Sequence, residues 1–363
     1  MSGHEVDLDG GERAVFRPSG ALRGSLTPPA DKSISHRAAI IGAIADGPTR
    51  VTNFLDSDDT RSTLSAVAGL GAMVNPEPLN AMPEEFTIEG VGPSGPRSLG
   101  RIDVGNAGTL MRLLPGWLAG CDGGLWRMNG DASIRKRPVD RIAIPLREMG
   151  AEIEVTDGRF PPIRIDGRQL TGITYELPVA SAQVKSCILL AGLRAEGPTT
   201  VVEPVATRDH TEVMLAAAGA EGEPIARITV RWAPLKGTRI EGAEIPLAID
   251  ELPVIALAAC FAEGETVIAD AEELKAKESD RIAVVVGALA GFGANIEARD
   301  DGMRIVGTGG LKGGQVDSHG DHRIAMLGAV AGIAGEEGVT VDGMDAAAVS
   351  YPTFQQDLAR LIG

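Results

Sequence analysis

The chain carries apolar residues at two spacings that alternate in a fixed order along its length. Four runs close an apolar pattern of helical spacing with a glycine near their C-terminal end: 64–74, 145–153, 212–221 and 287–297. Valine-rich runs bounded by glycine are typical of strands, and three of them lie between helices: 197–204, 264–270 and 338–343. The alternation predicts an α/β chain built from βαβ-type modules.

A second set of helices is apolar nearly all round, as in "AAIIGAIA", "CILLAGLRA", "VIALAACFA" and "IAMLGAVAGIA". Such helices are expected to lie inside a domain, with the sheets outside. A leucine-glycine turn introduces a module at five places, which begin at 22, 99, 170, 235 and 311. We therefore predict five repeats in a two-domain, inside-out α/β fold, with buried helices and outer sheets.

A polar cluster precedes the buried helix of every repeat. The clusters are "DKSISHR" (31–37), "GNAGTLMR" (105–112), "ASAQVKS" (180–186), "IDELP" (249–253) and "HGDHR" (319–323). N-capping by Ser, Thr or Asp explains each cluster taken singly. It does not explain the lysine or arginine in four of the five, because the helix dipole disfavours cations at that end. We expect these helix starts to meet at a bound anion between the domains.

Charge and cysteine usage narrow the class of partner. The chain has 50 acidic and 34 basic residues and no basic run, so its net charge of −16 disfavours nucleic acid and anionic membranes and favours small-molecule partners. Cys121, Cys187 and Cys260 are far apart and form no CxxC motif, which favours buried free thiols over a disulfide or a zinc site. The N-terminus lacks an apolar signal core, and we expect a cytoplasmic protein.

Eight motifs in order resemble those of the EPSP synthase family of enolpyruvyl transferases. They are "DKSISHR", "GNAGTLMR", "GDASIRKRP", "ASAQVKS", "TRDHTEVML", "IDELPV", "KESDR" and "GDHRIAM", and the resemblance runs from about residue 18 almost to the C-terminus. It implies transfer of the carboxyvinyl group of phosphoenolpyruvate to the 5-hydroxyl of shikimate 3-phosphate, with phosphate released through a tetrahedral ketal. It also implies a monomer that needs no metal or organic cofactor.

The residue types suit this chemistry, because two anionic substrates need cations and helix N-termini, and proton transfers need carboxylates. By resemblance, Lys32 touches both substrates, Asp250 takes the 5-hydroxyl proton, and Glu278 delivers a proton to the methylene carbon. The implied shikimate 3-phosphate contacts are Lys32, Ser33, Arg37, Ser181, Ala182 (backbone only), Gln183, Arg208 and Asp250. The implied phosphoenolpyruvate contacts are Lys32, Asn106, Gly108, Arg137, Gln183, Lys277, Arg281 and Arg323.

Gly108 has a particular role in this resemblance, because a side chain there would crowd phosphoenolpyruvate and the family's inhibitor glyphosate. Its presence indicates a glyphosate-sensitive type. We expect His36, His210 and His322 to be ordinary core or supporting histidines rather than catalytic groups.

The chain departs from the family in its repeat number, since the resemblance implies six repeats, three per domain. After "TRDHTEVMLAAAGA" (207–220) it passes directly to "EGEPIARITVRWAPLKG" (221–237), and the fourth repeat is skipped. The expected domains are therefore 18–220 with three repeats and 1–17 plus 221–363 with two. We expect apolar faces that the missing repeat would cover to be exposed.

Three alternatives remain open at this point. A related transferase acts on UDP-N-acetylglucosamine, but its reactive cysteine is replaced here by Ala132. A non-catalytic relic could bind shikimate 3-phosphate through its first domain without turnover. The natural protein could also contain a sixth repeat that this sequence omits.

Overall fold

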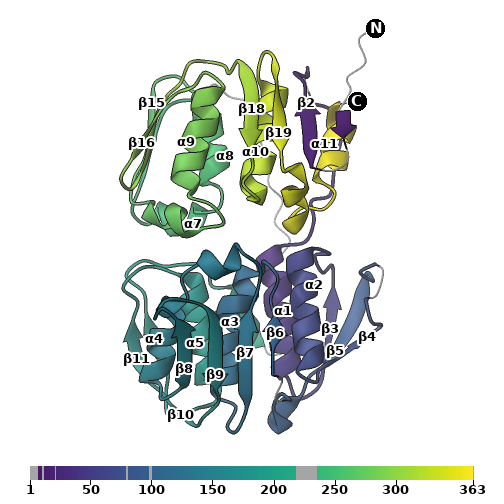
Figure 1. Cartoon of the computed structure of the whole chain (residues 1–363), viewed down its shortest axis with the longest axis vertical. Helices are drawn as coiled ribbons and strands as arrows, with labels where there is room; N and C mark the ends of the chain where they lie inside the picture. Colours follow the sequence, from purple (N-terminus) through teal and green to yellow (C-terminus); the bar gives the residue numbers. More distant parts are fainter. Residues whose placement is uncertain are drawn as a thin grey trace. The chain divides into compact units, whose positions relative to one another are not determined.

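The computed structural model describes residues 7–9, 12–20, 22–78, 81–97, 100–217 and 235–362. The chain forms two compact units (Figure 1): unit 1 comprises Met1–Pro28 and Ala226–Gly363, and unit 2 comprises Pro29–Ile225. The first dividing point lies between Pro28 and Pro29, eleven residues after the expected boundary at 17/18. The expected boundary at 220/221 and the turn leucine at 99 lie outside the described residues.

Unit 2 interleaves helices and short strands. Its helices are α1 (Lys32–Ile44), α2 (Asp58–Gly69), α3 (Gly108–Ala119), α4 (Asp140–Glu148), α5 (Ala182–Gly192) and α6 (His210–Ala217), with 3-10 turns η1 (Gly92–Ser94) and η2 (Ile134–Lys136). Its strands are β3 (Pro48–Thr52), β4 (Met73–Asn75), β5 (Glu85–Glu89), β6 (Ile102–Asp103), β7 (Leu125–Asn129), β8 (Glu152–Thr156), β9 (Phe160–Asp166), β10 (Leu170–Thr171), β11 (Thr174–Glu176), β12 (Ala195–Glu196) and β13 (Thr200–Val202).

Unit 1 follows the same pattern. Its helices are α7 (Glu244–Ala248), α8 (Leu252–Cys260), α9 (Arg281–Gly291), α10 (His322–Ala334) and α11 (Phe354–Ile362), with 3-10 turns η3 (Glu272–Ala276) and η4 (Met344–Val349). Its strands are β1 (Asp7–Asp9), β2 (Arg13–Phe16), β14 (Arg239–Ile240), β15 (Glu265–Ile268), β16 (Asn295–Arg299), β17 (Gly302–Val306), β18 (Gly313–Asp317) and β19 (Gly338–Asp342).

Sheet topology bears out the repeats. The order β6-β7-β9-β8 in unit 2 has one parallel pair followed by two antiparallel pairs, and β14-β15-β17-β16 in unit 1 has the same directions. In both sheets a buried helix connects the parallel pair, namely α3 or α8. The β3-β5-β4 sheet has the antiparallel part of this pattern, and β10-β12 and β11-β13 have the parallel part.

The last repeat is completed by the N-terminal strands. Strands β18 and β19 form its parallel pair, and β2 and β1 then extend the sheet in antiparallel directions. Phe16 pairs with Val339, so residues from the two ends of the chain are neighbours in one sheet. This arrangement places strand residues 7–16 in unit 1.

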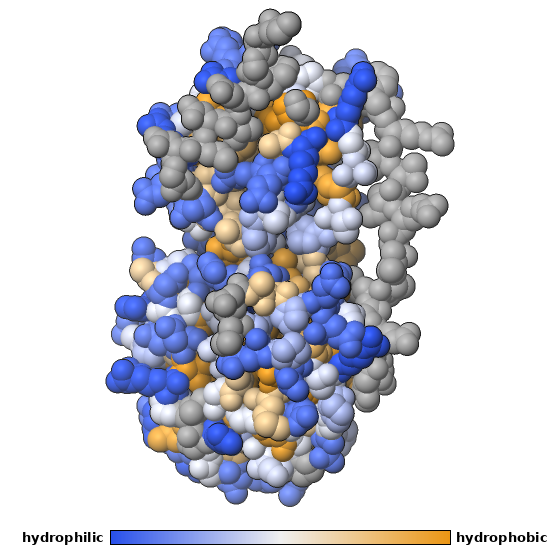
Figure 2. Space-filling model, turned by 90° about the vertical axis from the view of Figure 1, so that its right-hand side faces the viewer, coloured by the Kyte–Doolittle hydropathy of each residue, from blue (hydrophilic) through white to orange (hydrophobic). Residues whose placement is uncertain are grey.

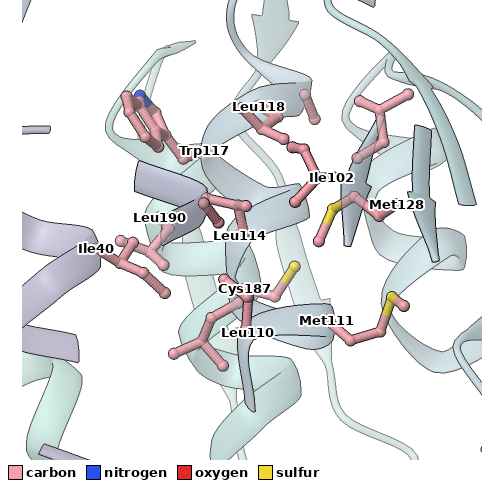
Figure 3. Packing of buried hydrophobic residues seen from close by; sticks show 14 of the residues in the cluster. Ile40, Ile102, Leu110, Met111, Leu114, Trp117, Leu118, Met128, Cys187 and Leu190 are labelled. Carbon is pink, nitrogen blue, oxygen red and sulfur yellow. The ribbon is translucent and has the colours of Figure 1, made fainter. Parts of the chain in front are cut away.

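The core of unit 2 is helical, as the sequence predicts. Every residue of α3 is buried, and Figure 3 shows its Leu110, Leu114 and Trp117 near Ile40 of α1 and Leu190 of α5. Gly116 allows a close approach to α5, because a Cβ atom on Gly116 would lie 2.1 Å from the carbonyl oxygen of Cys187. The strands lie outside these helices (Figure 1).

Two apolar side chains of neighbouring helices in unit 1 are exposed. Helices α10 and α8 are both buried over most of their length, as the sequence predicts, but α8 keeps an exposed face. Val254 of α8 is 49% exposed, and Leu247 of the preceding α7 is 55% exposed. Figure 2 shows apolar residues at the surface among hydrophilic ones. One face of α8 therefore lacks the covering that its composition favours.

The contact at Gly116 predicts a large effect of one added methyl group. Gly116→Ala should lower the free energy of unfolding by about 3 kcal/mol, because the backbone of α5 cannot move aside cheaply. The control is Gly287→Ala on α9, where a Cβ atom meets nothing within 4 Å. It should be neutral or stabilising by up to about 1 kcal/mol. Urea unfolding measures both, and equal effects of the two substitutions would contradict the close helix approach.

Candidate active site

The polar clusters of unit 2 lie at the starts of its buried helices. Asp31 caps α1 by accepting a hydrogen bond from the backbone N–H of Ile34 at 2.7 Å, and Ser181 caps α5 by accepting one from Val184. Helix α3 begins at Gly108 without a side-chain cap. Its first backbone N–H groups thus have no side-chain acceptor from the N-cap residue, as suits a helix start that receives an anion.

Lys32 and Arg37 lie on the first two turns of α1. The ammonium of Lys32 is 3.1 Å from Asp59 Oδ2 of α2, and the lysine side chain keeps 22% of its surface exposed. Arg37 is buried and donates to the Ser33 carbonyl oxygen at 3.1 Å, to Ser186 Oγ at 2.9 Å and to Thr211 Oγ1 at 2.6 Å. These contacts fix the direction of both cations in the folded chain.

The charge of Arg208 acts on Arg37. Burial, and after it the positive charge of Arg208, lower the pKa of Arg37 to about 10, although Asp31 and Glu212 act in the opposite direction. The charges of the two guanidinium groups repel each other, and a bound anion would relieve that repulsion. Two of the expected shikimate 3-phosphate residues therefore interact electrostatically.

Asn106, Gly108 and Arg137 also lie together. Arg137 Nη2 donates to Asn106 Oδ1 at 2.5 Å, and Asn106 Nδ2 donates to Asp131 Oδ2 at 2.7 Å. A Cβ atom on Gly108 would lie 2.8 Å from Arg137 Nη1 and 3.2 Å from Arg112 Nη1. Glycine at this position thus gives two guanidinium groups room beside the start of α3.

Arg112 is a site residue that the sequence analysis did not assign. Its Nη1 donates to Gln183 Oε1 at 3.1 Å, and Gln183 Nε2 donates to Thr109 Oγ1 at 3.2 Å. Gln183 therefore joins the starts of α3 and α5. The sequence does contain a signal for Arg112, because it is the last residue of the motif "GNAGTLMR" and lies one helical turn after Gly108.

The cation in the third cluster does not fit the anion explanation. Lys185 is buried, and its ammonium lies 2.8 Å from Glu203 Oε2 and 2.6 Å from Glu212 Oε1. Two carboxylates therefore already neutralise this ammonium. The argument from cations beside helix starts is wrong for Lys185.

In unit 1, three carboxylates surround Arg281 at the start of α9. Its side chain is 1% exposed, and its Nη1 lies 3.2 Å from Asp250 Oδ1 while its Nη2 lies 2.6 Å from Glu278 Oε2. Its Nε lies 2.9 Å from Asp321 Oδ2. Burial opposes the charged form, but Glu278, Asp321 and Asp250 raise the pKa of Arg281 above its usual value. The two expected catalytic carboxylates thus share one buried guanidinium.

Asp321 is the second residue that the sequence analysis did not assign. It is fully buried, caps α10 by accepting from the backbone N–H of Arg323 at 2.9 Å, and accepts from Ser279 Oγ at 2.9 Å. It therefore links α10 to the segment that carries Glu278. Its place in "HGDHR" suggested an ordinary N-cap, and its partner Arg281 is 40 residues distant.

The remaining expected cations of unit 1 have carboxylate neighbours. Arg323 Nη2 lies 3.9 Å from Asp250 Oδ2, and Arg323 Nη1 lies 3.9 Å from Glu251 Oε1. Lys277 Nζ lies 3.5 Å from Glu273 Oε1. Asp250 is thus next to both Arg281 and Arg323.

The histidines and cysteines behave largely as expected. His36 is fully buried, with its Nδ1 2.6 Å from Thr63 Oγ1, and His322 is buried at the start of α10. Cys121, Cys187 and Cys260 are buried free thiols, and burial raises the pKa of Cys121 and of Cys260 to about 11. A raised pKa keeps these thiols protonated and unreactive.

A comparison with known families and proteins complements this geometry. The model of the family EPSP synthase (3-phosphoshikimate 1-carboxyvinyltransferase) matches residues 16–230 and 221–358. The chain belongs to the EPSP synthase family.

Curated relatives in this family share about two fifths of their residues with the chain. The 3-phosphoshikimate 1-carboxyvinyltransferase of Desulfitobacterium hafniense is 41% identical over 422 residues, covering 93% of this chain and 95% of the relative. The same-named protein of Halorhodospira halophila is 40% identical over 432 residues, covering 97% and 96%. The high coverage on both sides shows that the likeness is not confined to one unit.

Solved structures give the same family. EPSP synthase from Acinetobacter baumannii has a TM-score of 0.76 and 36% identity, and the match covers 96% of this chain and 98% of that structure. The enolpyruvyl transferase NikO from Streptomyces tendae has a TM-score of 0.67 at 16% identity, which shows a shared fold alone.

The alignments also bear on the skipped repeat of this EPSP synthase family member. They run over 422 and 432 positions, more than the 363 residues of the chain, so they include positions that this chain does not fill. The two family matches meet at 221–230. Both findings agree with a repeat missing after residue 220, which stays a prediction because that junction lies outside the described residues.

Within the described ranges of the chain, two other kinds of site are absent. No helix there is long and apolar enough to cross a membrane. No group of three or more His, Cys, Asp or Glu side chains there is arranged to hold a metal ion.

His36 predicts a pH dependence of stability. Burial and the charges of Lys32 and Arg37 hold the pKa of His36 well below 6.5, so the unfolded chain takes up a proton more readily than the folded chain does. Stability should therefore fall as the pH drops below about 6.5, by up to about 1.4 kcal/mol per pH unit from this group. His36→Asn should flatten the curve of unfolding free energy between about pH 5 and 6.5. The control His319→Asn removes an exposed histidine, and an equal flattening by that control would rule out the assignment.

Proposed function

We propose that this chain transfers the enolpyruvyl group of phosphoenolpyruvate to the 5-hydroxyl of shikimate 3-phosphate, giving 5-enolpyruvylshikimate 3-phosphate and phosphate. Its family membership and the names of its relatives support this reaction. The structural observation that carries the proposal is the sharing of Arg281 by Asp250 and Glu278. Two fixed carboxylates beside a cation are what a proton-transferring site for anionic substrates requires.

The proposed contacts of the two substrates overlap. Shikimate 3-phosphate binds Ser33, Arg37, Ser181, Ala182 (backbone only), Gln183, Arg208 and Asp250. Phosphoenolpyruvate binds Asn106, Gly108, Arg137, Gln183, Lys277, Arg281 and Arg323. Lys32, which Asp59 orients at 3.1 Å, contacts both substrates.

The proposed chemistry conserves protons. Glu278 gives a proton to the methylene carbon of phosphoenolpyruvate, the 5-hydroxyl oxygen bonds to the adjacent carbon, and Asp250 takes the hydroxyl proton. The resulting tetrahedral ketal returns a proton from its new methyl group to Glu278 and expels phosphate by C–O cleavage, which restores the carbon–carbon double bond, and the departing phosphate takes up the hydroxyl proton held by Asp250. The fixed cations stabilise the negative charge that develops on the departing phosphate.

The family match and the names of the relatives favour this reaction over that of the transferase for UDP-N-acetylglucosamine, and Ala132 cannot supply a thiol. The relic alternative predicts binding without turnover. Asp250, Glu278 and Arg281 in direct contact favour turnover, because a protein under no catalytic constraint has no need of this arrangement.

We also propose that the protein acts as a cytoplasmic monomer on small-molecule substrates. The three buried free thiols suit a reducing compartment. Light scattering under assay conditions tests the monomer.

Phosphate release tests the reaction itself. Purified protein of the expected intact mass should release phosphate from the two substrates together and from neither alone. Asp250→Ala and Glu278→Gln should each lower the rate by about 100-fold or more. Glu154→Gln, which alters an exposed ion pair with Arg164, is the control and should leave the rate unchanged. Binding of shikimate 3-phosphate with no phosphate release by the unaltered chain would establish the relic.

Gly108→Ala should weaken the binding of phosphoenolpyruvate but not that of shikimate 3-phosphate. The added Cβ displaces the tips of Arg137 and Arg112, which are flexible, so the unfolding free energy should change by less than about 1 kcal/mol. The KM for phosphoenolpyruvate should rise about tenfold, corresponding to about 1.4 kcal/mol. The KM for shikimate 3-phosphate should stay within twofold. Gly100→Ala, where a Cβ meets nothing within 4 Å, is the control, and equal changes in both KM values would refute the placement of phosphoenolpyruvate.

A further inference from the structure

Lys185 forms a buried junction between three elements of unit 2. It lies on α5, and it joins Glu203, just after β13, to Glu212, on α6. The lysine side chain is 6% exposed, and its two oxygen partners are 2.8 Å and 2.6 Å away. One ammonium thus holds both ends of the segment 203–212.

A second layer of hydrogen bonds supports the same segment. Thr207 Oγ1 donates to Glu203 Oε1. Ser186, the neighbour of Lys185, has its Oγ 2.6 Å from Oγ1 of Thr211, the neighbour of Glu212. The same threonine oxygen accepts from Arg37 Nε at 2.6 Å. Adjacent residues of α5 therefore hold adjacent residues of α6, and the second pair also contacts Arg37.

The charge balance of this junction explains why it needs a cation. Burial lowers the pKa of Lys185, but hydrogen bonds and charges from Glu203 and Glu212 together raise it above its usual value. Without the ammonium, two carboxylates would face each other and repel. The segment between them would then open to hydrate both groups.

Arg208 is carried by this segment, four residues before Glu212. Arg37 donates to Thr211 at 2.6 Å, three residues after Arg208, so the closed segment holds Arg208 in the region of Arg37, on which its charge acts. We propose that Lys185 is a positioning residue that closes the segment 203–212 and thereby places Arg208 beside Arg37 for the substrate phosphate. The identity of that substrate rests on the proposed function, whereas the closure of the segment does not.

Lys185 is not itself proposed as a phosphate ligand, because its ammonium is buried between two carboxylates. Its effect is expected on the affinity for shikimate 3-phosphate through Arg208. A purely structural role would instead change stability without separating the two substrates.

Amide hydrogen exchange of the ligand-free full chain tests the closure directly. In Lys185→Met the amides of 203–212 should exchange at least about tenfold faster, corresponding to about 1.4 kcal/mol, while those of β8 and β9 keep their rates. Lys185→Arg retains the positive charge and should restore most of the protection. Glu212→Gln is a milder variant if the methionine variant does not fold. Unchanged exchange of 203–212 in a folded Lys185→Met or Glu212→Gln protein would overturn the proposal.

Kinetics then test the effect on Arg208. Lys185→Met should raise the KM for shikimate 3-phosphate about tenfold and leave the KM for phosphoenolpyruvate within twofold. In a double-mutant cycle with Arg208→Ala, the combined variant should be no worse than Arg208→Ala alone. Multiplicative effects would show that Lys185 does not act through Arg208, and would refute that part of the proposal.

Inorganic phosphate separates failure of this proposal from failure of the proposed function. The Lys185→Met and Arg208→Ala variants should each bind inorganic phosphate about tenfold more weakly than the unaltered chain does. If phosphate binds in this way but shikimate 3-phosphate does not, the proposed substrate is wrong and the positioning role of Lys185 stands. If substrate turnover is normal and neither exchange nor phosphate affinity changes in Lys185→Met, the proposed function stands and this inference is wrong.

Discussion

Helices that are buried on every side can offer polar groups only at their ends, and this constraint governs the whole molecule. All residues of α3 from Gly108 to Ala119 are buried, and α10 is buried over most of its length. Charged side chains can therefore gather at the N-termini without being placed in an apolar interior. The sheets outside the helices cover the cores and leave these starts available for chemistry.

The cations at those starts are held by protein groups before any substrate arrives. Asp59 holds Lys32, three carboxylates hold Arg281, and hydroxyl and carbonyl oxygens hold Arg37. Such contacts order the cationic side chains in advance, so less conformational entropy is lost when a substrate binds. They also keep the donors in fixed directions. The carboxylates also reduce the repulsion that several clustered cations would suffer.

Much of the fold could be predicted from the sequence, because it depends on local periodicity. The runs at 197–204, 264–270 and 338–343 contain the strands β13, β15 and β19, and the polar clusters lie at helix starts. The cysteines are buried and free as expected. These features follow from spacing, composition and capping within a few residues.

The less predictable features depend on contacts between distant residues. Arg281 meets Asp321 40 residues away, and Lys185 meets Glu203 and Glu212 on other elements, so short motifs did not reveal either pairing. The roles of Arg112 and Asp321 escaped notice for the same reason. The exposure of Val254 could not be predicted, because the apolar composition of a helix shows only that burial would be favourable. Whether a side chain is buried depends on which other elements pack against it.

The pairing of β2 with β19 has a consequence for the order in which the protein forms during synthesis. Unit 2 is continuous along the chain, so it can fold as soon as its last residues leave the ribosome. Phe16, by contrast, has no partner in its sheet until Val339 has been made. At the usual speed of translation that delay is roughly 16–65 s, during which strand β2 is present without β19. Strand β2 is thus made before unit 2 but paired with β19 only after it.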